Sequence, residues 1–308
     1  MQENERMDIQ LLRAFVIAAE EHSFSSAAER LHITQSAISK RIALLEQHIG
    51  QILFDRIARK VHLTEAGQRL LPRAQSIINA IDDTQRYMSA SNNTVNGELR
   101  LATSHHIGIH RLPPILKSYR QRYPDVHLQL QFIDSEHAES LLLQDKCDLA
   151  ITTLPSHNDD IVNNDIQYHT LWHDPLQIVI NPQHPLLQKA KKRQVQPSIA
   201  ELLSYPVILP NMSTRTTQLI LQQFNTKQRQ LNIAMTSNHL DAIKMMVAVG
   251  LGWSVLPEIM IDNSLELLHI EEFSIIRQLG CLHHRHRTLS NSARAMLHSM
   301  QEIPQQTE

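Results

Sequence analysis

Three short amphipathic segments, with a tight turn between the second and the third, constrain the fold more than any other feature of the sequence. Apolar side chains recur every three or four residues over 8–20, which predicts a first helix. Residues 25–31 predict a short second helix, and Thr34 is a good N-cap for a third helix over 35–48. A short helix, a turn and a helix with a polar first turn are typical of a helix-turn-helix.

The predicted third helix separates an apolar stripe from a polar start. The stripe has spacings of four, three and four residues, at Ile38, Ile42, Leu45 and Ile49. At the polar start, Gln35 can form two hydrogen bonds with adenine. The hydroxyl and cationic groups that can bond bases or phosphates beside it lie at Thr34, Ser36, Ser39, Lys40 and Arg41. An ordinary three-helix bundle with a polar helix start is the alternative.

A basic stretch surrounds and follows this helix, although the formal net charge of the whole chain is -2. Residues 30–73 hold eight Lys and Arg residues against three Asp and Glu residues, a local net charge of +5. Within this stretch, residues 53–64 alternate apolar and polar side chains around a turn that contains Arg56, Arg59 and Lys60. The pattern predicts a basic wing that contacts the DNA backbone or minor groove. A solvated face of a helical domain is the alternative.

A dense series of motifs covers these segments. In chain order the motifs are Phe24-Ser25-x-Ala27-Ala28, Leu31, Thr34 to Ser39 (TQSAIS), Leu45-Glu46, Gly50, Leu53-Phe54-x-Arg56 and Leu63 to Gly67 (LTEAG). Their order resembles the winged helix-turn-helix of LysR-type transcriptional regulators. The resemblance implies a double-stranded DNA operator as partner, contacted by Thr34, Gln35, Ser36, Ser39 and Lys40, and by Arg56, Arg59 and Lys60 in the wing.

Residues 67–91 predict a long helix after the wing. Its apolar positions alternate between spacings of four and three residues, as in a coiled-coil seam, at Leu70, Ala74, Ile77, Ile81, Thr84 and Met88. Pro72 is discordant, because an interior proline removes a hydrogen bond, and it predicts a kink or a new helical start. LysR-type regulators dimerise through this helix, which suits a twofold DNA site. A helix docked on its own domain is the alternative.

The pattern changes beyond a polar hinge at 89–97. Strands are predicted over 97–103, 127–134 and 148–153, with helices between them, and the alternation resumes in a second series that ends with GWSVLPE. This β-α-β-α-β order predicts two α/β lobes and a largely parallel sheet. The predicted fold class is α/β, with an N-terminal domain dominated by helices.

The second part of the chain also contains motifs that match LysR-type regulators. They are Tyr123-Pro124, Cys147 to Ile151 (CDLAI), Gly250-Leu251-Gly252 and Leu256-Pro257-Glu258. The resemblance implies an effector domain similar to periplasmic binding proteins, whose first lobe includes the C-terminal strand and helix. The implied division is a winged helix-turn-helix over 1–66, a linker helix over 67–91, lobe I over 92–164 and 268–302, and lobe II over 165–267.

Four polar corners, each between a predicted strand and a predicted helix, are candidate ligand contacts. Ligands of open α/β sheets lie beyond the carboxyl ends of the strands, where helix N-termini present free N–H groups. The candidate effector-binding residues at these corners are Thr103, Ser104, His105, His106, Ser135, Ser213, Thr214, Arg215 and Asn238. These groups suit a small anion or carboxylate; Arg215 strengthens that expectation and Asp134 weighs against it. An ordinary N-cap is the alternative at each corner.

Histidine-rich segments raise a second hypothesis, a metal- or thiol-responsive regulator. His106 and His110 have the spacing of a zinc pair on a helix. Further imidazole and thiol groups lie at Cys147, Cys281, His283, His284 and His286. The 19 histidines are scattered along the chain and nothing in the sequence brings these segments together, so no metal site is predicted. At a strand-to-helix corner, His105 and His106 are instead expected to donate to an anion, with protonation near pH 6.5, while His110 only packs.

Several other classes are excluded by the sequence. No run approaches the roughly 18 apolar residues of a membrane span, and the start MQENERMDIQ lacks the basic and apolar regions of a signal peptide. Two cysteines cannot form a disulfide framework. These features predict a cytoplasmic protein without membrane contact and exclude a solute-uptake protein. Nucleophile elbow, phosphate-cradling loop and HExxH motifs are absent from the sequence, so neither an enzyme nor a cofactor is expected.

The resulting prediction is a homodimeric or homotetrameric LysR-type regulator. A small effector in the cleft between the lobes is expected to favour one arrangement of the lobes over another. Through the linker helices this change would alter the spacing of the DNA half-sites or the bend of the DNA. RNA polymerase is the further partner that the resemblance implies.

Overall fold

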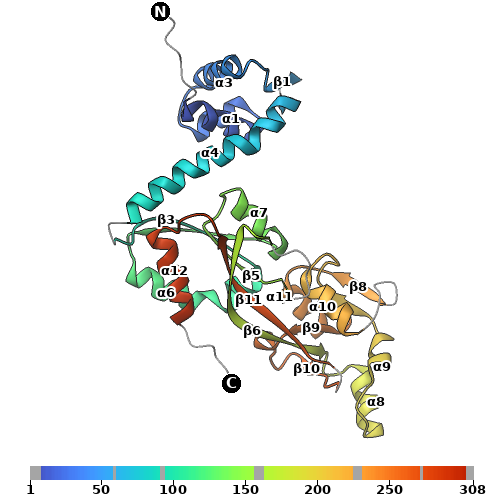
Figure 1. Ribbon diagram of the computed structural model, residues 1–308. Coiled ribbons are helices and arrows are strands. Elements are labelled where there is room, and N and C mark those ends of the chain that lie inside the picture. The colour runs from blue at the N-terminus through green and yellow to red at the C-terminus, as the bar shows by residue number, and fades with distance from the viewer. Residues whose placement is uncertain are drawn as a thin grey trace, which may run out of the picture. The chain divides into compact units, whose positions relative to one another are not determined.

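The chain divides into two compact units, residues 1–91 and 92–308. The computed structural model shown in Figure 1 describes residues 8–57, 60–90, 94–155, 163–224, 231–270 and 273–302. Each unit has a hydrophobic core of its own. Within the described ranges, no helix has both the length and the hydropathy that crossing a bilayer requires.

The N-terminal unit contains the predicted helix-turn-helix and a two-stranded antiparallel wing. Its elements are α1 (Ile9–Glu21), α2 (Phe24–Arg30), α3 (Gln35–Ile49), β1 (Phe54–Ile57), β2 (Lys60–Leu63) and α4 (Glu65–Ala90). Side chains cap the first three helices, because Asp8, Ser23 and Thr34 each accept a hydrogen bond from a backbone N–H of the first turn. Phe15 and Leu45 are fully buried between the helices.

The long helix α4 runs through Pro72 as one segment, so the new helical start predicted there is wrong. A proline inside a helix leaves one backbone hydrogen bond unmade. The turns that follow are stabilised by Ala74 and Ile78, which are buried in the core of the N-terminal unit. Ile77 and Ile81 of the predicted seam are 46% and 37% exposed. The helix therefore both docks on its own unit and presents an apolar stripe to solvent.

The C-terminal unit alternates strands and helices, as predicted. Its first elements are β3 (Gly97–Thr103), α5 (His105–His110), α6 (Leu112–Arg122), β4 (Val126–Phe132), η1 (Ser135–His137), α7 (Ala138–Leu143), β5 (Leu149–Thr153) and β6 (Ile166–Ile180). The next are α8 (Pro185–Arg193), α9 (Ile199–Leu203), β7 (Val207–Leu209), α10 (Arg215–Gln223), β8 (Ile233–Thr236), α11 (Leu240–Ala248), β9 (Ser254–Pro257) and η3 (Glu258–Met260). The last are β10 (Glu266–Leu267), β11 (Ile275–His284) and α12 (Asn291–Glu302).

A seven-stranded mixed sheet runs through this unit in the order β10-β6-β11-β5-β3-β4, with β9 also paired to β6. In this sheet β3 pairs in parallel with its neighbours β4 and β5, whereas β11 is antiparallel to both β5 and β6, and β6 is antiparallel to β9 and β10. The predicted largely parallel sheet is therefore correct for β3, β4 and β5 and wrong for the other strands of this sheet. A strand that is buried on both faces has the same apolar pattern in either direction, so the pattern did not reveal the return of β11.

The strands β6 and β11 lie side by side and pass through both lobes (Figure 1). Trp172 packs in the core of lobe I, and Leu176 of the same strand packs in the core of lobe II. On β11, Ile275 belongs to lobe II and Leu279 to lobe I. The predicted lobe divisions at residues 165 and 268 therefore lie too early in the chain, because both strands change lobes near their middles.

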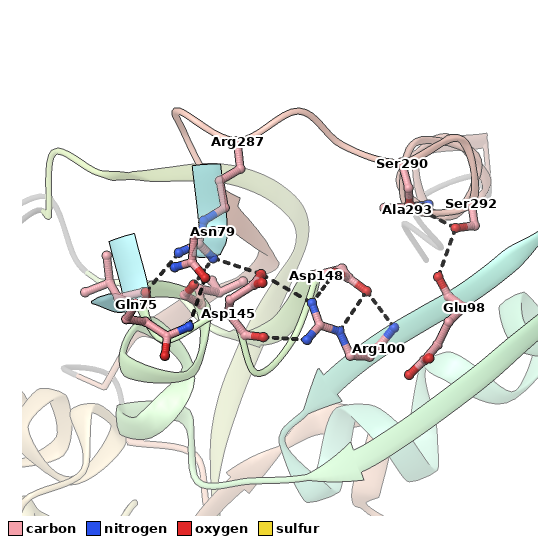
Figure 2. A network of polar contacts seen from close by, with 12 residues as sticks. Gln75, Asn79, Glu98, Arg100, Asp145, Asp148, Arg287, Ser290, Ser292 and Ala293 are labelled. Carbon is pink, nitrogen blue, oxygen red and sulfur yellow. Dashed lines mark hydrogen bonds and ion pairs between the residues drawn. The ribbon is translucent and has the colours of Figure 1, made fainter. Parts of the chain in front are cut away.

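A network of ion pairs holds the segment after β11 against lobe I (Figure 2). Arg100 of β3 contacts Asp148 at 2.8 Å and Asp145 at 3.3 Å, and Arg287 contacts Asp145 at 3.0 Å. The network ties β3, the segment before β5 and the segment after β11 to one another. Lobe I therefore includes the segment after β11, although Arg287 and Asp145 are 142 positions apart in sequence.

Candidate functional site

A pocket of about 50 Å³ lies between the two lobes of the C-terminal unit. Residues after the carboxyl ends of β3, β4, β7 and β8, with the last residue of β5, converge on it. Its lining consists of Ser104, His105, His106, Ile133, Asp134, Ser135, Glu136, Thr153, Pro210, Thr214, Arg215, Thr216, Asn238, Leu240 and Arg277. A volume of this size holds a few water molecules or a small anion.

Most of the candidate effector residues are brought together by this pocket. They are Ser104, His105, His106, Ser135, Thr214, Arg215 and Asn238. Thr103 and Ser213 do not line it. The Thr103 hydroxyl is fully buried and donates to the carbonyl of Ile151, 3.1 Å away, so it holds two strands together. Ser213 is exposed and precedes the cap of α10, where Thr214 accepts from the N–H of Thr217.

Ser104 lies between the last residue of β3 and the first residue of α5. Its side chain is only 7% exposed, and its Oγ atom has no hydrogen-bond partner among the described residues. It occupies the N-cap position of α5 without making the capping hydrogen bond. A buried hydroxyl without a partner costs free energy, on the order of 1 to 3 kcal/mol. A ligand that bonds to Ser104 would remove this cost.

One wall of the pocket is formed by Arg277, which makes a buried ion pair with Asp174 between the lobe-crossing strands. Arg277 of β11 is 3% exposed, and its Nε donates to Oδ2 of the fully buried Asp174 on β6 at 3.0 Å. Nη1 of Arg277 donates to the Thr216 hydroxyl of lobe II at 2.8 Å. Arg111 donates to the other carboxylate oxygen of Asp174 at 3.3 Å. Two guanidinium groups thus share one carboxylate, so the three groups together carry a net positive charge.

His106 accepts a hydrogen bond in this wall. Its Nε2 lies 3.1 Å from Nη2 of Arg277, and because a guanidinium can only donate, Nε2 is the acceptor. Burial lowers the pKa of His106 well below its usual value, and the charge of Arg277 lowers it further. Asp174 lies 3.9 Å from the same nitrogen, but the guanidinium groups already neutralise that carboxylate. The expected protonation of His106 near pH 6.5 is therefore wrong.

The free energy of unfolding should therefore decrease as the pH falls, and part of this decrease should depend on His106. Above pH 6.5 its imidazole is neutral in both the folded and the unfolded chain, and its contribution to stability is fully present. As the pH falls below 6.5, the unfolded chain takes up a proton that the folded chain does not, so the free energy of unfolding decreases. Urea unfolding at pH 7.5 and 5.5 should show a smaller loss for His106→Gln than for the unchanged chain. Equal losses would contradict this assignment.

Arg215 connects the lobes instead of standing free in the pocket. Its Nη2 contacts Glu139 at 3.1 Å, its Nη1 donates to the carbonyl of Thr153 at 3.2 Å, and its backbone N–H donates to Glu136 at 3.2 Å. All three partners belong to lobe I, whereas Arg215 begins α10 of lobe II. The expectation that this guanidinium strengthens an anion site is therefore weakened, because its charge is already paired.

Two further contacts between the lobes involve histidines. The His105 ring lies 4.7 Å from that of Phe132 and 4.4 Å from that of His239, between centroids. Nε2 of His110 lies 3.2 Å from Oδ1 of Asp241 on α11, so the expectation that His110 only packs is wrong. Together with Arg215, these side chains make contacts between lobe I and lobe II.

The predicted DNA-contacting residues lie at the start of α3. Thr34, Gln35, Ser36 and Lys40 are exposed and Ser39 is half-buried. Thr34 uses its hydroxyl oxygen to cap the helix, accepting from the N–H of Ala37 at 3.2 Å, and contacts the Ser36 hydroxyl at 2.9 Å. Of the wing residues, Arg56 lies in β1 and Lys60 in β2, but the structure does not describe their side chains. Arg59 lies outside the described residues.

The thiol hypothesis gains no support from the two cysteines. Cys147 and Cys281 are buried, and burial raises the pKa of both thiols, that of Cys147 to about 12. A thiol held protonated in apolar surroundings is a poor nucleophile and a poor metal ligand. In the part of the chain that the structure describes, no three His, Cys, Asp or Glu side chains converge on one point where a metal ion could bind.

The sequence reasoning missed the buried ion pair of Arg277 with Asp174 at the pocket wall. Asp174 lies between Trp172 and Leu176 on one strand face, and Arg277 lies between Ile275 and Leu279. A charged residue at an alternate position of an apolar strand face predicts a buried charge. Asp174 and Arg277 are also directly opposite each other in the register of β6 and β11. The pattern could have identified both residues, but not their pairing.

Comparison with known proteins agrees with this architecture. Residues 9–68 match the family model of the bacterial regulatory helix-turn-helix protein of the lysR family, and residues 92–304 match that of the LysR substrate binding domain. The chain is 29% identical over 288 residues to the HTH-type transcriptional activator CmpR of Synechocystis sp., covering 92% of this chain and 91% of that one.

Solved structures share the fold. A full-length OxyR variant from Pseudomonas aeruginosa has a TM-score of 0.73 at 21% identity, covering 97% of this chain and 99% of that one. Full-length CbnR complexed with its target DNA has a TM-score of 0.59 at 19% identity, covering 95% and 98%. The two matched models together span the helix-turn-helix and the two-lobed unit. The chain belongs to the LysR family of transcriptional regulators, which are DNA-binding proteins with an effector-binding domain and are not enzymes.

Proposed function

We propose that this regulator responds to a small anion bound in the pocket between its lobes. The observation that carries the proposal is the unpartnered, buried hydroxyl of Ser104 in a pocket that the guanidinium of Arg277 also lines. A carboxylate or oxyanion accepts a hydrogen bond from a serine hydroxyl and is stabilised by nearby guanidinium groups. The acidic side chains of Asp134 and Glu136 in the pocket lining disfavour a large polyanion, and the small volume also favours a compact one.

On the DNA side, we infer that α3 reads base edges in the major groove of a pseudo-palindromic operator. Its exposed Gln35 is in the first turn, where recognition helices contact bases. The apolar stripe of α4 suits pairing with a second copy of the chain, because Ile77, Ile81 and Met88 are all exposed. A homodimer, or a homotetramer built from two dimers, matches a twofold operator. CbnR, which shares the fold, has been solved with its target DNA.

Control of transcription then requires that the effector binds one arrangement of the lobes more tightly than another. The contacts of Arg215 with Glu139, of His105 with His239 and of His110 with Asp241 all join lobe I to lobe II. An anion at Ser104 would alter the balance of these contacts. We propose that this change is passed through α4 to the DNA-bound helices and so to RNA polymerase.

The test of the effector site uses Ser104→Ala with Ser213→Ala as the matched control. Thermal unfolding of the full chain is measured with sulfate, phosphate, acetate and dicarboxylates of about three to six carbons. A ligand that raises the melting temperature of the unchanged chain should bind Ser104→Ala about 10- to 100-fold more weakly, the cost of one hydrogen bond to a charged group. Ser213 is exposed and outside the pocket, so its variant should respond normally. An undiminished response of Ser104→Ala would overturn the proposed site.

A further inference from the structure

Two histidines on the lobe-crossing strands face each other outside the pocket. Nε2 of His169 on β6 lies 3.0 Å from Nε2 of His283 on β11. The ring planes are inclined at 19°, with centroids 5.1 Å apart, and both side chains are half-buried. The pocket lining includes neither residue. This pair has no part in the proposed effector or DNA site.

A bulge in the sheet brings the two side chains to the same face. Between Leu279 and Gly280 the register of β11 on β6 shifts by one residue, so that His169 lies opposite Cys281. Cys281 and His283 alternate along β11 and share a face. Without the bulge, His169 would lie opposite Leu282 and face away from His283. Gly280 permits this geometry, since a Cβ atom there would lie 2.3 Å from the backbone oxygen of His169.

The hydrogen bonding of His283 shows which of its ring nitrogens carries the proton. Its Nδ1 lies 3.1 Å from the backbone carbonyl oxygen of His284, which can only accept, so Nδ1 carries the proton. Its Nε2 lone pair therefore points toward His169. Proteins orient metal-binding imidazoles in the same way, with the second ring nitrogen donating to a carbonyl or carboxylate.

We propose that His169 and His283 form a binding site for a divalent transition metal of the zinc, nickel and copper class. Imidazole nitrogens suit these ions. Two nitrogens on a tetrahedral ion, each at about 2.05 Å, are roughly 3.3 Å apart, so the pair needs to open by only a few tenths of an ångström. Among the described residues, no third His, Cys, Asp or Glu completes a cluster. Water fills the remaining positions, and the ion ties β6 to β11 at their lobe I ends.

The experiment titrates ZnCl2 into the untagged, EDTA-stripped full chain by calorimetry. His169→Gln and His283→Gln are compared with the control His286→Gln, which removes a neighbouring exposed histidine. We expect one zinc ion per chain in the unchanged protein and the control. Affinity should fall at least tenfold in both pair variants, since losses of about 10- to 100-fold follow even the removal of second-layer partners. Loss of affinity in only one of the two pair variants would overturn the site.

A second measurement needs no variant. The electron paramagnetic resonance spectrum of the unchanged chain with one equivalent of Cu²⁺ should show two equatorial nitrogen ligands. No zinc uptake at about 100 µM, or equal losses in the control and the pair variants, would mean that the two imidazoles share only an N–H···N hydrogen bond. A copper spectrum without nitrogen coupling would have the same meaning. Because the effector proposal does not involve these residues, its test is independent of this one.

Discussion

Replacing Arg277 with methionine should lower the free energy of unfolding of the C-terminal unit by about 3 to 5 kcal/mol, the cost of breaking a buried ion pair by removing one partner. Asp174 would keep its buried charge with only Arg111, 3.3 Å away, as a cationic partner among the described residues. The lobe contact through Thr216 would also be lost. Urea unfolding followed by tryptophan fluorescence measures the effect in the full chain, because Trp172 and Trp253 both lie in this unit.

The matched comparison is the double variant Asp174→Asn with Arg277→Met. Removing both charges leaves no unpaired carboxylate, so the double variant should be more stable than Arg277→Met alone. The non-additivity of the two substitutions then measures their coupling, which is expected between contacting residues. If Asp174→Asn destabilised the Arg277→Met chain further, by the same amount as in the unchanged chain, the two residues would not be coupled and the ion pair would not be the source of stability.

Replacing Leu45 with alanine should abolish operator binding by destabilising the N-terminal unit by about 2 to 5 kcal/mol. Leu45 is fully buried on the inner face of α3 and packs in the core that α1 and α2 also form. The cavity would loosen α3, whose first turn carries the predicted DNA contacts. Thermal unfolding followed by far-ultraviolet circular dichroism should show a lower transition for the helical unit, while tryptophan fluorescence of the C-terminal unit should change little.

The control for Leu45→Ala is Gln35→Ala on the same helix. Gln35 is exposed, so its replacement should alter stability by no more than about 0.5 kcal/mol. Selection from random duplexes should show a relaxed base preference at one position, worth about 1 to 3 kcal/mol of discrimination. If Gln35→Ala kept full preference at every position, Gln35 would not contact a base. If Leu45→Ala bound the operator normally, the core of the unit would not position α3.

The helix-turn-helix was predictable because its determinants are close together in sequence. The capping hydroxyl of Thr34 and the stripe through Ile38, Ile42 and Leu45 act within one helix, and the structure contains both. The polar corners between strands and helices of the C-terminal unit were predictable for the same reason. Ser104, Thr214 and Asn238 each follow a strand and precede a helix, which places them beyond the carboxyl end of that strand.

The direction and partners of distant strands were not predictable from such patterns. β11 returns antiparallel through both lobes, although its apolar pattern fits a parallel strand equally well. The pairing of Arg277 with Asp174 joins residues 103 positions apart, and its hydrogen bond to His106 joins residues 171 positions apart. The low pKa of His106 also depends on this packing, because it results from burial and from the charge of Arg277 on a distant strand.

By itself, the sequence determined which residues cap, which face a core and which end a strand, because periodicity and capping are properties of a few consecutive residues. The tertiary structure alone decided which of these residues meet. In the folded chain Ser104 and Arg277 line the same pocket, the charge of Arg215 is paired with Glu139, and a one-residue bulge places His169 beside His283. Register between strands depends on packing over the whole sheet, and a shift of one residue reverses the face of every side chain that follows.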